Sequence, residues 1–295
     1  MATTTRAPAR TAPPRQAVQA APSKRTRPNF LAGIGGWIWL AVTIVPVYYV
    51  VITSLKKQGA YFSSNPLLPP GSPTLSNYAL VLESDFFRYF ANSLIVTVGS
   101  VLTTLLFAFM AAYAIVRGRT RFLTLTHRLF LLGLAIPLHA TIIPIYWMIT
   151  KAHLYDTLAA LILPSIAFAI PISVLILSTF LRDVPRELFE SMRLDGCGEW
   201  AMMWRLALPL VRPAVVTVGI YDALTVWNGF LFPLILTQSP EIRVLPLSLW
   251  TFQGEFTINI PAVLASVVLA TLPLLVVYVI ARRQLVSGLT AGFGK

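Results

Sequence analysis

The sequence predicts an all-α integral membrane protein with six membrane-spanning helices. The chain of 295 residues is 56% hydrophobic and only 12% charged, and that charged share is about half of the usual share in a soluble domain. Its mean hydropathy is +0.73. Between the charged residues, six apolar windows reach the roughly 20 residues that a helix needs to cross a bilayer core. They are Phe30–Leu55, Tyr89–Val116, Leu129–Thr150, Thr157–Leu181, Pro213–Leu236 and Phe256–Ala281.

Residues 1–29 precede the first window and are rich in Ala, Pro, Thr and basic residues. A segment of this composition buries too little apolar surface to offset the entropy lost on ordering. We therefore expect a disordered cytoplasmic tail. It does not read as a cleaved secretory signal, because the apolar run after it is too long for a signal-peptide core and lacks a clear cleavage site.

The six windows form the predicted transmembrane domain, 30–281, and most of them contain proline. Kinked spans are typical of a packed bundle that lines a pathway rather than of a simple anchor. The prolines concerned are Pro46, Pro137, Pro144, Pro164, Pro171, Pro233 and Pro273.

The basic residues predict the orientation of the chain in the membrane. Eighteen of the 23 Lys and Arg residues lie in the first tail, in the segment around 117–128, in the loop 182–212 and in the last residues, 282–295. Cytoplasmic segments carry the excess of Lys and Arg. We therefore expect both termini and the loop 182–212 on the cytoplasmic side of a bacterial-type plasma membrane. The remaining five lie in the outside segments: Lys56, Lys57, Arg88, Lys151 and Arg243.

Several chemistries are excluded by composition and motif. The net charge of +12 follows the topology of the loops, so we expect the lipid bilayer and not nucleic acid as the partner of these charges. One cysteine, Cys197, and three scattered histidines provide neither a disulfide nor a metal site. No G-x-x-x-x-G-K-[ST] phosphate loop, Ser/His/Asp set or paired carboxylates stand out, so we predict no catalytic residues and no ATPase site in this chain.

The charged segment from Pro185 to Pro213 predicts two short helices joined by a turn. Asp195-Gly196 ends the first helix, since Gly tolerates the left-handed conformation of a helix stop. A second helix carries Trp200 and Trp204 and is expected to end or kink near Pro209. A rigid helix-turn-helix on a membrane surface suggests a plug for a soluble partner, although an ordinary amphipathic loop has similar composition.

This segment resembles the signature of permease subunits of ATP-binding-cassette (ABC) importers. The family pattern is Glu-Ala-Ala, three residues, Gly, nine residues, an aliphatic residue, one residue and Leu-Pro. Here the blocks are Glu190-Ser191-Met192, Gly196, Leu206 and Leu208-Pro209, and Ser-Met stands where the family prefers two alanines. The resemblance implies that Glu190 is a charged contact to an ATPase subunit, that Gly196 forms the turn and that Leu188, Phe189 and Met192 form an inserted apolar edge. The full expected coupling set is Glu187, Leu188, Phe189, Glu190, Met192, Asp195 and Gly196.

The C-terminal stretch from Arg283 to Gly292 is similar to the ending of sugar-importer permeases of the maltose type. In that family the tail reaches the interface between two ATPase subunits. We expect an extended tail in close contact through Gly288, Leu289, Thr290 and Gly292. A frayed terminus is the alternative that composition alone favours.

The resemblance extends from about Asn77 to Lys295 and is to the smaller, six-span partner of the maltose-type permease pair. It implies the type I ABC importer permease fold with cytoplasmic coupling helices. It also implies a second permease subunit, two ABC ATPase subunits that hold ATP and Mg²⁺, and an extracytoplasmic sugar-binding protein. The chain itself then needs no cofactor.

Asp222 is the only Asp, Glu, Lys or Arg within a window, which makes it a candidate for the substrate pathway. Sugar hydroxyls bind carboxylates, and Trp227 and Asn228 lie nearby in sequence. The alternatives are pairing of Asp222 with a polar group on another helix, and interhelical packing of Trp227 and Asn228.

The predicted function is the permease subunit of an ATP-driven sugar importer. The alternatives are an ABC permease for another solute such as a polyamine or amino acid, an ion-coupled secondary transporter, and a membrane scaffold without transport. A secondary transporter would contain several intramembrane ionisable residues and repeat symmetry, whereas this chain has one Asp, Glu, Lys or Arg within its windows and no repeat.

Overall fold

The computed structural model describes residues 30–252 and 258–291, and every regular element in these ranges is a helix. The chain forms two units, Met1–Val45 and Pro46–Lys295. Helix α1 (Phe30–Ser54) begins in the first unit and ends in the second. The predicted N-terminal tail, 1–29, lies outside the described residues.

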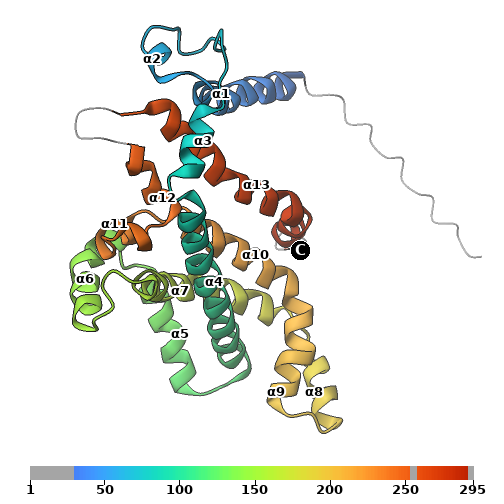
Figure 1. Cartoon of the computed structure of the whole chain (residues 1–295). Helices are drawn as coiled ribbons and strands as arrows, with labels where there is room; N and C mark the ends of the chain where they lie inside the picture. Colours follow the sequence, from blue (N-terminus) through green and yellow to red (C-terminus); the bar gives the residue numbers. More distant parts are fainter. Residues whose placement is uncertain (1–29, 253–257, 292–295) are drawn as a thin grey trace, which may run out of the picture. The chain divides into compact units, whose positions relative to one another are not determined.

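The second unit contains the remaining helices (Figure 1). They are α2 (Gln58–Tyr61), α3 (Ser76–Glu83), α4 (Phe86–Arg117), α5 (Arg121–Gly133), η1 (Leu138–Thr141), α6 (Ile142–Lys151), α7 (Leu158–Arg182), α8 (Arg186–Leu194), α9 (Glu199–Met202), the π-helical turn η2 (Met203–Ala207), α10 (Leu208–Trp227), α11 (Leu231–Leu236), η3 (Pro240–Ile242), α12 (Leu245–Ser248), η4 (Leu249–Phe252) and α13 (Ile260–Ala291).

Five helices of the described residues are long and apolar enough to cross a membrane, and a bent pair makes a sixth if it forms one span. The bend separates Arg121–Gly133 from Leu138–Lys151 and measures 98°. Pro137 lies in the break with an extended backbone conformation, and the residue before a proline is also disfavoured in a helix. The predicted third window, Leu129–Thr150, is therefore broken and not continuous. The prediction of an all-α membrane protein is confirmed, with five spans in the described ranges, or six if the bent pair is one span.

The fifth window is displaced from its predicted position. The helix runs from Glu199 to Trp227, and residues 231–236 form the separate helix α11. The predicted end or kink near Pro209 is replaced by the π-helical turn η2 immediately before it. A wider turn accommodates a residue that lacks an N–H donor, so the helix continues through the proline.

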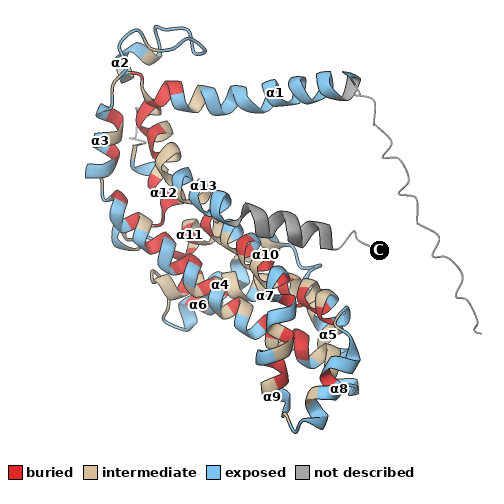
Figure 2. Ribbon diagram, turned by 90° about the vertical axis from the view of Figure 1, so that its right-hand side faces the viewer, coloured by how far each residue is buried: buried red, intermediate tan, exposed pale blue. Residues whose placement is uncertain are grey.

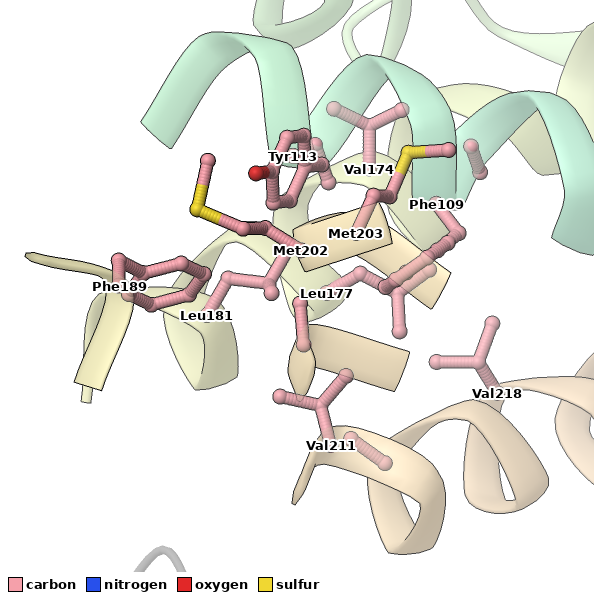
Figure 3. Packing of buried hydrophobic residues seen from close by; sticks show 14 residues of the cluster. Phe109, Tyr113, Val174, Leu177, Leu181, Phe189, Met202, Met203, Val211 and Val218 are labelled. Carbon is pink, nitrogen blue, oxygen red and sulfur yellow. The ribbon is translucent and has the colours of Figure 1, made fainter. Parts of the chain in front are cut away.

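Helices α4, α7 and α10 pack against one another and form the core of the second unit. Figure 3 shows Phe109 of α4, Leu177 of α7 and Val218 of α10 meeting there. Outward-facing positions of the same unit carry large apolar side chains, among them Leu102, Phe107 and Leu132. Exposed apolar side chains on long helices are typical of contact with lipid.

Two segments between helices are held by side-chain hydrogen bonds to the backbone. Asn77 in α3 donates to the carbonyls of Ser54 and Lys56, both at 2.8 Å. Asn92 in α4 donates to the carbonyls of Glu241 at 2.7 Å and Arg243 at 2.8 Å. These contacts lie in the segments for which the charge distribution predicts an outside location.

Candidate functional site

Helix α8 and the turn after it form the predicted coupling hairpin. Glu187 lies in the first turn of α8 and Arg193 in the last turn, and both charges are favourable with respect to the helix dipole. At the end of α8 the amide of Cys197 donates to the carbonyl of Met192 and the amide of Gly196 to that of Arg193. This pair of bonds is a Schellman motif. Gly196 has a φ of +79°, so its predicted role as the turn residue is confirmed.

Phe189 does not belong to the exposed edge that the sequence predicts. Its side chain is 2% exposed and is a member of the same hydrophobic cluster as Tyr113 and Met202 (Figure 3). Met192 is half-buried and packs against this cluster. Both side chains therefore attach α8 to the membrane domain, and Phe189 is not free to insert into another protein. The physical reason is that the underside of α8 rests on α4, a contact between segments far apart in sequence.

The outer face of α8 remains accessible. Glu187, Leu188, Glu190 and Asp195 are exposed, as predicted for residues that meet a partner. The most exposed large apolar residue of the hairpin is Leu194, at 90%, which the family pattern does not single out. Figure 2 shows α8 as a mainly exposed helix.

A chain of polar contacts joins the hairpin to α4. The Tyr113 hydroxyl donates to a carboxylate oxygen of Glu199 at 2.8 Å. The other oxygen of Glu199 accepts from the Arg193 guanidinium and forms an ion pair with it. The guanidinium carbon of Arg117 lies 4.0 Å from the centre of the Phe189 ring, within the range of a cation–π contact.

Sequence reasoning missed Tyr113, Arg117 and Glu199 as members of this site. Tyr113 and Arg117 are one helical turn apart, at the end of α4, on one face of that helix. The available signal was a phenol and a guanidinium close together at the end of an apolar span. Only the fold shows that both residues meet the hairpin.

The predicted tail contacts lie in or beyond α13. Gly288, Leu289 and Thr290 are part of this helix, which continues to Ala291, and Gly292 lies outside the described residues. The expected extended conformation is therefore wrong for Gly288, Leu289 and Thr290, whereas their contact with an ATPase stays a prediction. The stretch 282–291 contains no proline, so nothing removes a backbone hydrogen bond from the helix.

A cavity of about 200 Å³ lies within the second unit, and helices α4, α7, α10 and α11 contribute to its walls. Most of its lining is apolar, and five of the lining side chains are aromatic: Phe168, Tyr221, Trp227, Phe230 and Phe232. The polar side chains that line it include Ser165, Thr225 and Asp222. An apolar concave site with a few polar groups is the usual form of a small-molecule site.

The structure brings two of the three predicted pathway residues to this cavity. Asp222 lines it, is 1% exposed and lies 2.9 Å from the Ser173 hydroxyl of α7, whose single proton is shared between this carboxylate and the Ala169 carbonyl at 2.8 Å. Trp227 also lines it, while its indole N–H donates to the Ala270 carbonyl at 3.2 Å. Asn228 is exposed, is not a lining residue, and donates to the Leu224 carbonyl at 2.8 Å. Asp222 thus both pairs with a polar group of another helix and lines the cavity.

The fold and the hairpin define a multi-pass membrane transport subunit. Residues 104–290 match the family described as the binding-protein-dependent transport system inner membrane component. The chain belongs to this family, which confirms the resemblance read from the signature segment.

Known relatives and a solved structure agree with this membership. The chain is 40% identical over 255 residues to the putative ABC transporter permease protein ORF2 of Caldicellulosiruptor sp. (strain Rt8B.4), covering 86% of this chain and 93% of the relative. It is 33% identical over 270 residues to the diacetylchitobiose uptake system permease protein DasC of Streptomyces coelicolor, covering 87% and 96%. A chain of a bacterial ABC transporter that imports the acidic polysaccharide alginate shares the fold, with a TM-score of 0.73 and 21% identity over 88% of this chain and 98% of that chain.

Proposed function

We propose that the protein is the permease subunit of an ATP-driven importer for a sugar, and that the coupling hairpin receives the movement of a separate ATPase. The observation that carries this proposal is the geometry of α8: a helix closed by a Schellman motif, packed on the membrane domain through Phe189 and open to solvent through Glu187, Leu188 and Glu190. A sugar is favoured as the substrate because the relative DasC takes up diacetylchitobiose.

The proposed assembly contains a second permease subunit, two ABC ATPase subunits and an extracytoplasmic sugar-binding protein. ATP and Mg²⁺ bind to the ATPase subunits. Both termini and the hairpin lie on the cytoplasmic side. Support for this orientation comes from the excess of Lys and Arg in those segments, and from the need for the hairpin to lie where ATP is available.

The polar chain explains how movement of the hairpin would reach α4. The hairpin is continuous in sequence with α7 and with the helix that contains α10, so these two helices follow it directly. Helix α4 is not adjacent to the hairpin in sequence and follows it through side-chain contacts, which include its packing on α7 and α10. Tyr113, Glu199 and Arg193 supply such contacts. We therefore assign Glu199 as a positioning residue that makes α4 move with α8.

Substrate passage requires two states of the permease that the ATPase contacts differently. In the proposed cycle, the sugar-loaded binding protein docks outside, the ATPases close on ATP, and the hairpins of both permeases move as rigid bodies. The permease pair then changes from inward-facing to outward-facing. The core of α4, α7 and α10 transmits this change as a packed unit, because close-packed interiors shift between discrete arrangements.

Reconstitution tests the proposal. Vesicles that contain this chain, its second permease and its ATPases are supplied with binding protein and labelled diacetylchitobiose or another neutral oligosaccharide. Accumulation that depends on ATP and on the ATPase supports the proposal. Accumulation driven by an ion gradient without ATP, or an ATPase that does not copurify with the chain, overturns it.

A further inference from the structure

Near Asp222, the cavity between α4, α7, α10 and α11 offers a ligand more hydrogen-bond acceptors than donors. The hydroxyl of Ser93, which accepts from the Leu245 amide, and that of Tyr221 remain as donors in the lining. The Ser165 hydroxyl already donates to the Leu161 carbonyl at 2.7 Å, and the Thr225 hydroxyl to the Tyr221 carbonyl at 2.9 Å. Their protons are thus committed to the backbone, and their oxygen lone pairs remain. The Asp222 carboxylate accepts from Ser173 and has further acceptor capacity. A matching ligand has to bring donors.

The described cavity lining contains an acidic side chain and no basic one. Among the described residues that line it, Asp222 is the only ionisable group apart from the phenol of Tyr221, and none is Lys, Arg or His. An anionic ligand would face a carboxyl group and acceptor oxygens, with no cation to replace its lost hydration. Anion entry is therefore unfavourable at this wall.

The aromatic lining adds a second requirement. Phe168 and Phe232 lie with their ring centres 5.9 Å apart, and the Phe230 ring is 5.7 Å from that of Trp250. Rings of this kind bury the apolar C–H faces of a ligand. A neutral sugar combines such faces with O–H donors. With about 200 Å³, the cavity is smaller than the roughly 300–1,000 Å³ of drug-sized sites, so it suits one sugar ring rather than a chain.

We infer that this cavity receives one ring of a neutral saccharide during passage, and that Asp222 is a specificity-determining residue against anionic sugars. The inference rests on the proposed sugar import and adds the charge class of the substrate. The fold alone does not fix that class, because a transporter of the same fold imports the acidic polysaccharide alginate.

The test uses the purified complex of both permeases and both ATPases without the binding protein. Saturation-transfer NMR measures weak binding of two probes of similar size, the neutral disaccharide diacetylchitobiose and the acidic disaccharide digalacturonate. The wild-type complex is expected to bind the neutral probe and not the acidic one. In Asp222→Asn the side chain keeps an acceptor for Ser173 or a sugar hydroxyl but loses the carboxylate. The ratio of acidic to neutral binding is expected to rise about tenfold, equivalent to about 1.4 kcal/mol.

A second variant keeps the test decisive if Asp222→Asn does not assemble. Thr225 is exposed, so Thr225→Lys places a cation at the cavity without changing the buried pair of Asp222 and Ser173. It is expected to admit the acidic probe, whereas the matched Thr225→Val is expected to weaken binding of the neutral probe only. The inference is overturned if the wild type prefers the acidic probe or if neither Asp222→Asn nor Thr225→Lys changes the ratio. ATP-dependent uptake that persists in that case leaves the proposed function intact.

Discussion

The Tyr113 hydroxyl donates a hydrogen bond to the Glu199 carboxylate at 2.8 Å, and this bond joins α4 to the start of the helix that follows the coupling hairpin. The two residues are 86 positions apart in sequence. Because Glu199 also pairs with Arg193 of α8, one carboxylate connects three helices. Removal of this group should affect how they move together more than whether they fold.

Tyr113→Phe removes the bond to Glu199 and keeps the aromatic packing. A typical hydrogen bond contributes about 0.5–1.5 kcal/mol, so we expect a complex that assembles but imports less sugar for each ATP hydrolysed. The measurement is the ratio of labelled sugar accumulated to phosphate released in vesicles. The matched control is Tyr278→Phe, since Tyr278 is exposed on α13. An unchanged ratio in Tyr113→Phe would show that α4 follows the hairpin without this bond.

The pair of Arg193 and Glu199 permits a charge exchange. Glu199→Gln is expected to weaken coupling because it removes the ion pair with α8. The double variant Arg193→Glu with Glu199→Arg restores that pair but leaves Tyr113 only the backbone carbonyl of residue 199, at 3.4 Å, as an acceptor, so only partial recovery of the sugar-to-ATP ratio is expected. Full recovery would indicate that Tyr113 contributes nothing, and no recovery would indicate that the ion pair contributes nothing.

Substitutions of Gly196 test backbone strain without steric crowding. Its φ is +79°, and a Cβ built at this position meets no atom within 4 Å. Gly196→Val should therefore act through the backbone, at a cost of at least about 1–2 kcal/mol, and should abolish transport and coupled ATP hydrolysis while membrane insertion continues. Gly196→Asn should retain part of the activity, because Asn tolerates the left-handed conformation. Normal transport by Gly196→Val would contradict a rigid turn.

Phe189 and Leu194 lie on opposite faces of the hairpin and should give opposite results. Phe189→Ala opens a cavity in the packed cluster and is expected to lower stability by about 3–5 kcal/mol. Leu194→Ala changes an exposed side chain, so stability should stay within about 0.5 kcal/mol while copurification of the ATPase declines. Thermal unfolding of the permease and the amount of ATPase recovered with it separate the two effects. Loss of ATPase without loss of stability in Phe189→Ala would place Phe189 at the partner interface after all.

Asp156 anchors the segment after α11. Burial tends to raise the pKa of its carboxyl, but bonds from the amides of Gln238 and Ser239 and from the Ser239 hydroxyl outweigh this, and the pKa lies below its ordinary value of 3.8. The stabilisation is thus present above pH 3.8 and is lost as the pH falls through the lower folded-state pKa. At neutral pH we expect faster amide exchange of residues 237–243 in Asp156→Asn, measured by mass spectrometry. Asp85→Asn serves as the exposed control, and equal exchange in Asp156→Asn and wild type would contradict the anchor.

The sequence predicted local features well and contacts between helices poorly. Gly196 was predictable because the left-handed region favours glycine wherever a helix must stop. The burial of Phe189 was not, since the direction in which α8 faces depends on Tyr113 and Arg117 of a distant helix. Hydrophobicity alone made Phe189 and Leu188 equivalent, although one is buried and the other exposed.

The membrane spans show the same difference between local features, which were predictable, and contacts between helices, which were not. Apolar windows predicted where the membrane helices lie, but two of them had wrong boundaries. The fifth span includes Arg205 and Arg212, and a window defined by the absence of charged residues excludes both. At the cavity, Asp222 was identified by its charge, whereas its partner Ser173 required the packing of α7 on α10.

The helical state of residues 282–291 limits how far the end of the chain extends. Ten residues rise about 15 Å as an α-helix but span about 33 Å when stretched out. A terminus held in α13 therefore covers less than half of the length available to an unwound one. If the last residues contact an ATPase at a distance greater than about 15 Å, the final turns of α13 have to unfold during assembly. The extended length would then be reached only when the ATPase is bound.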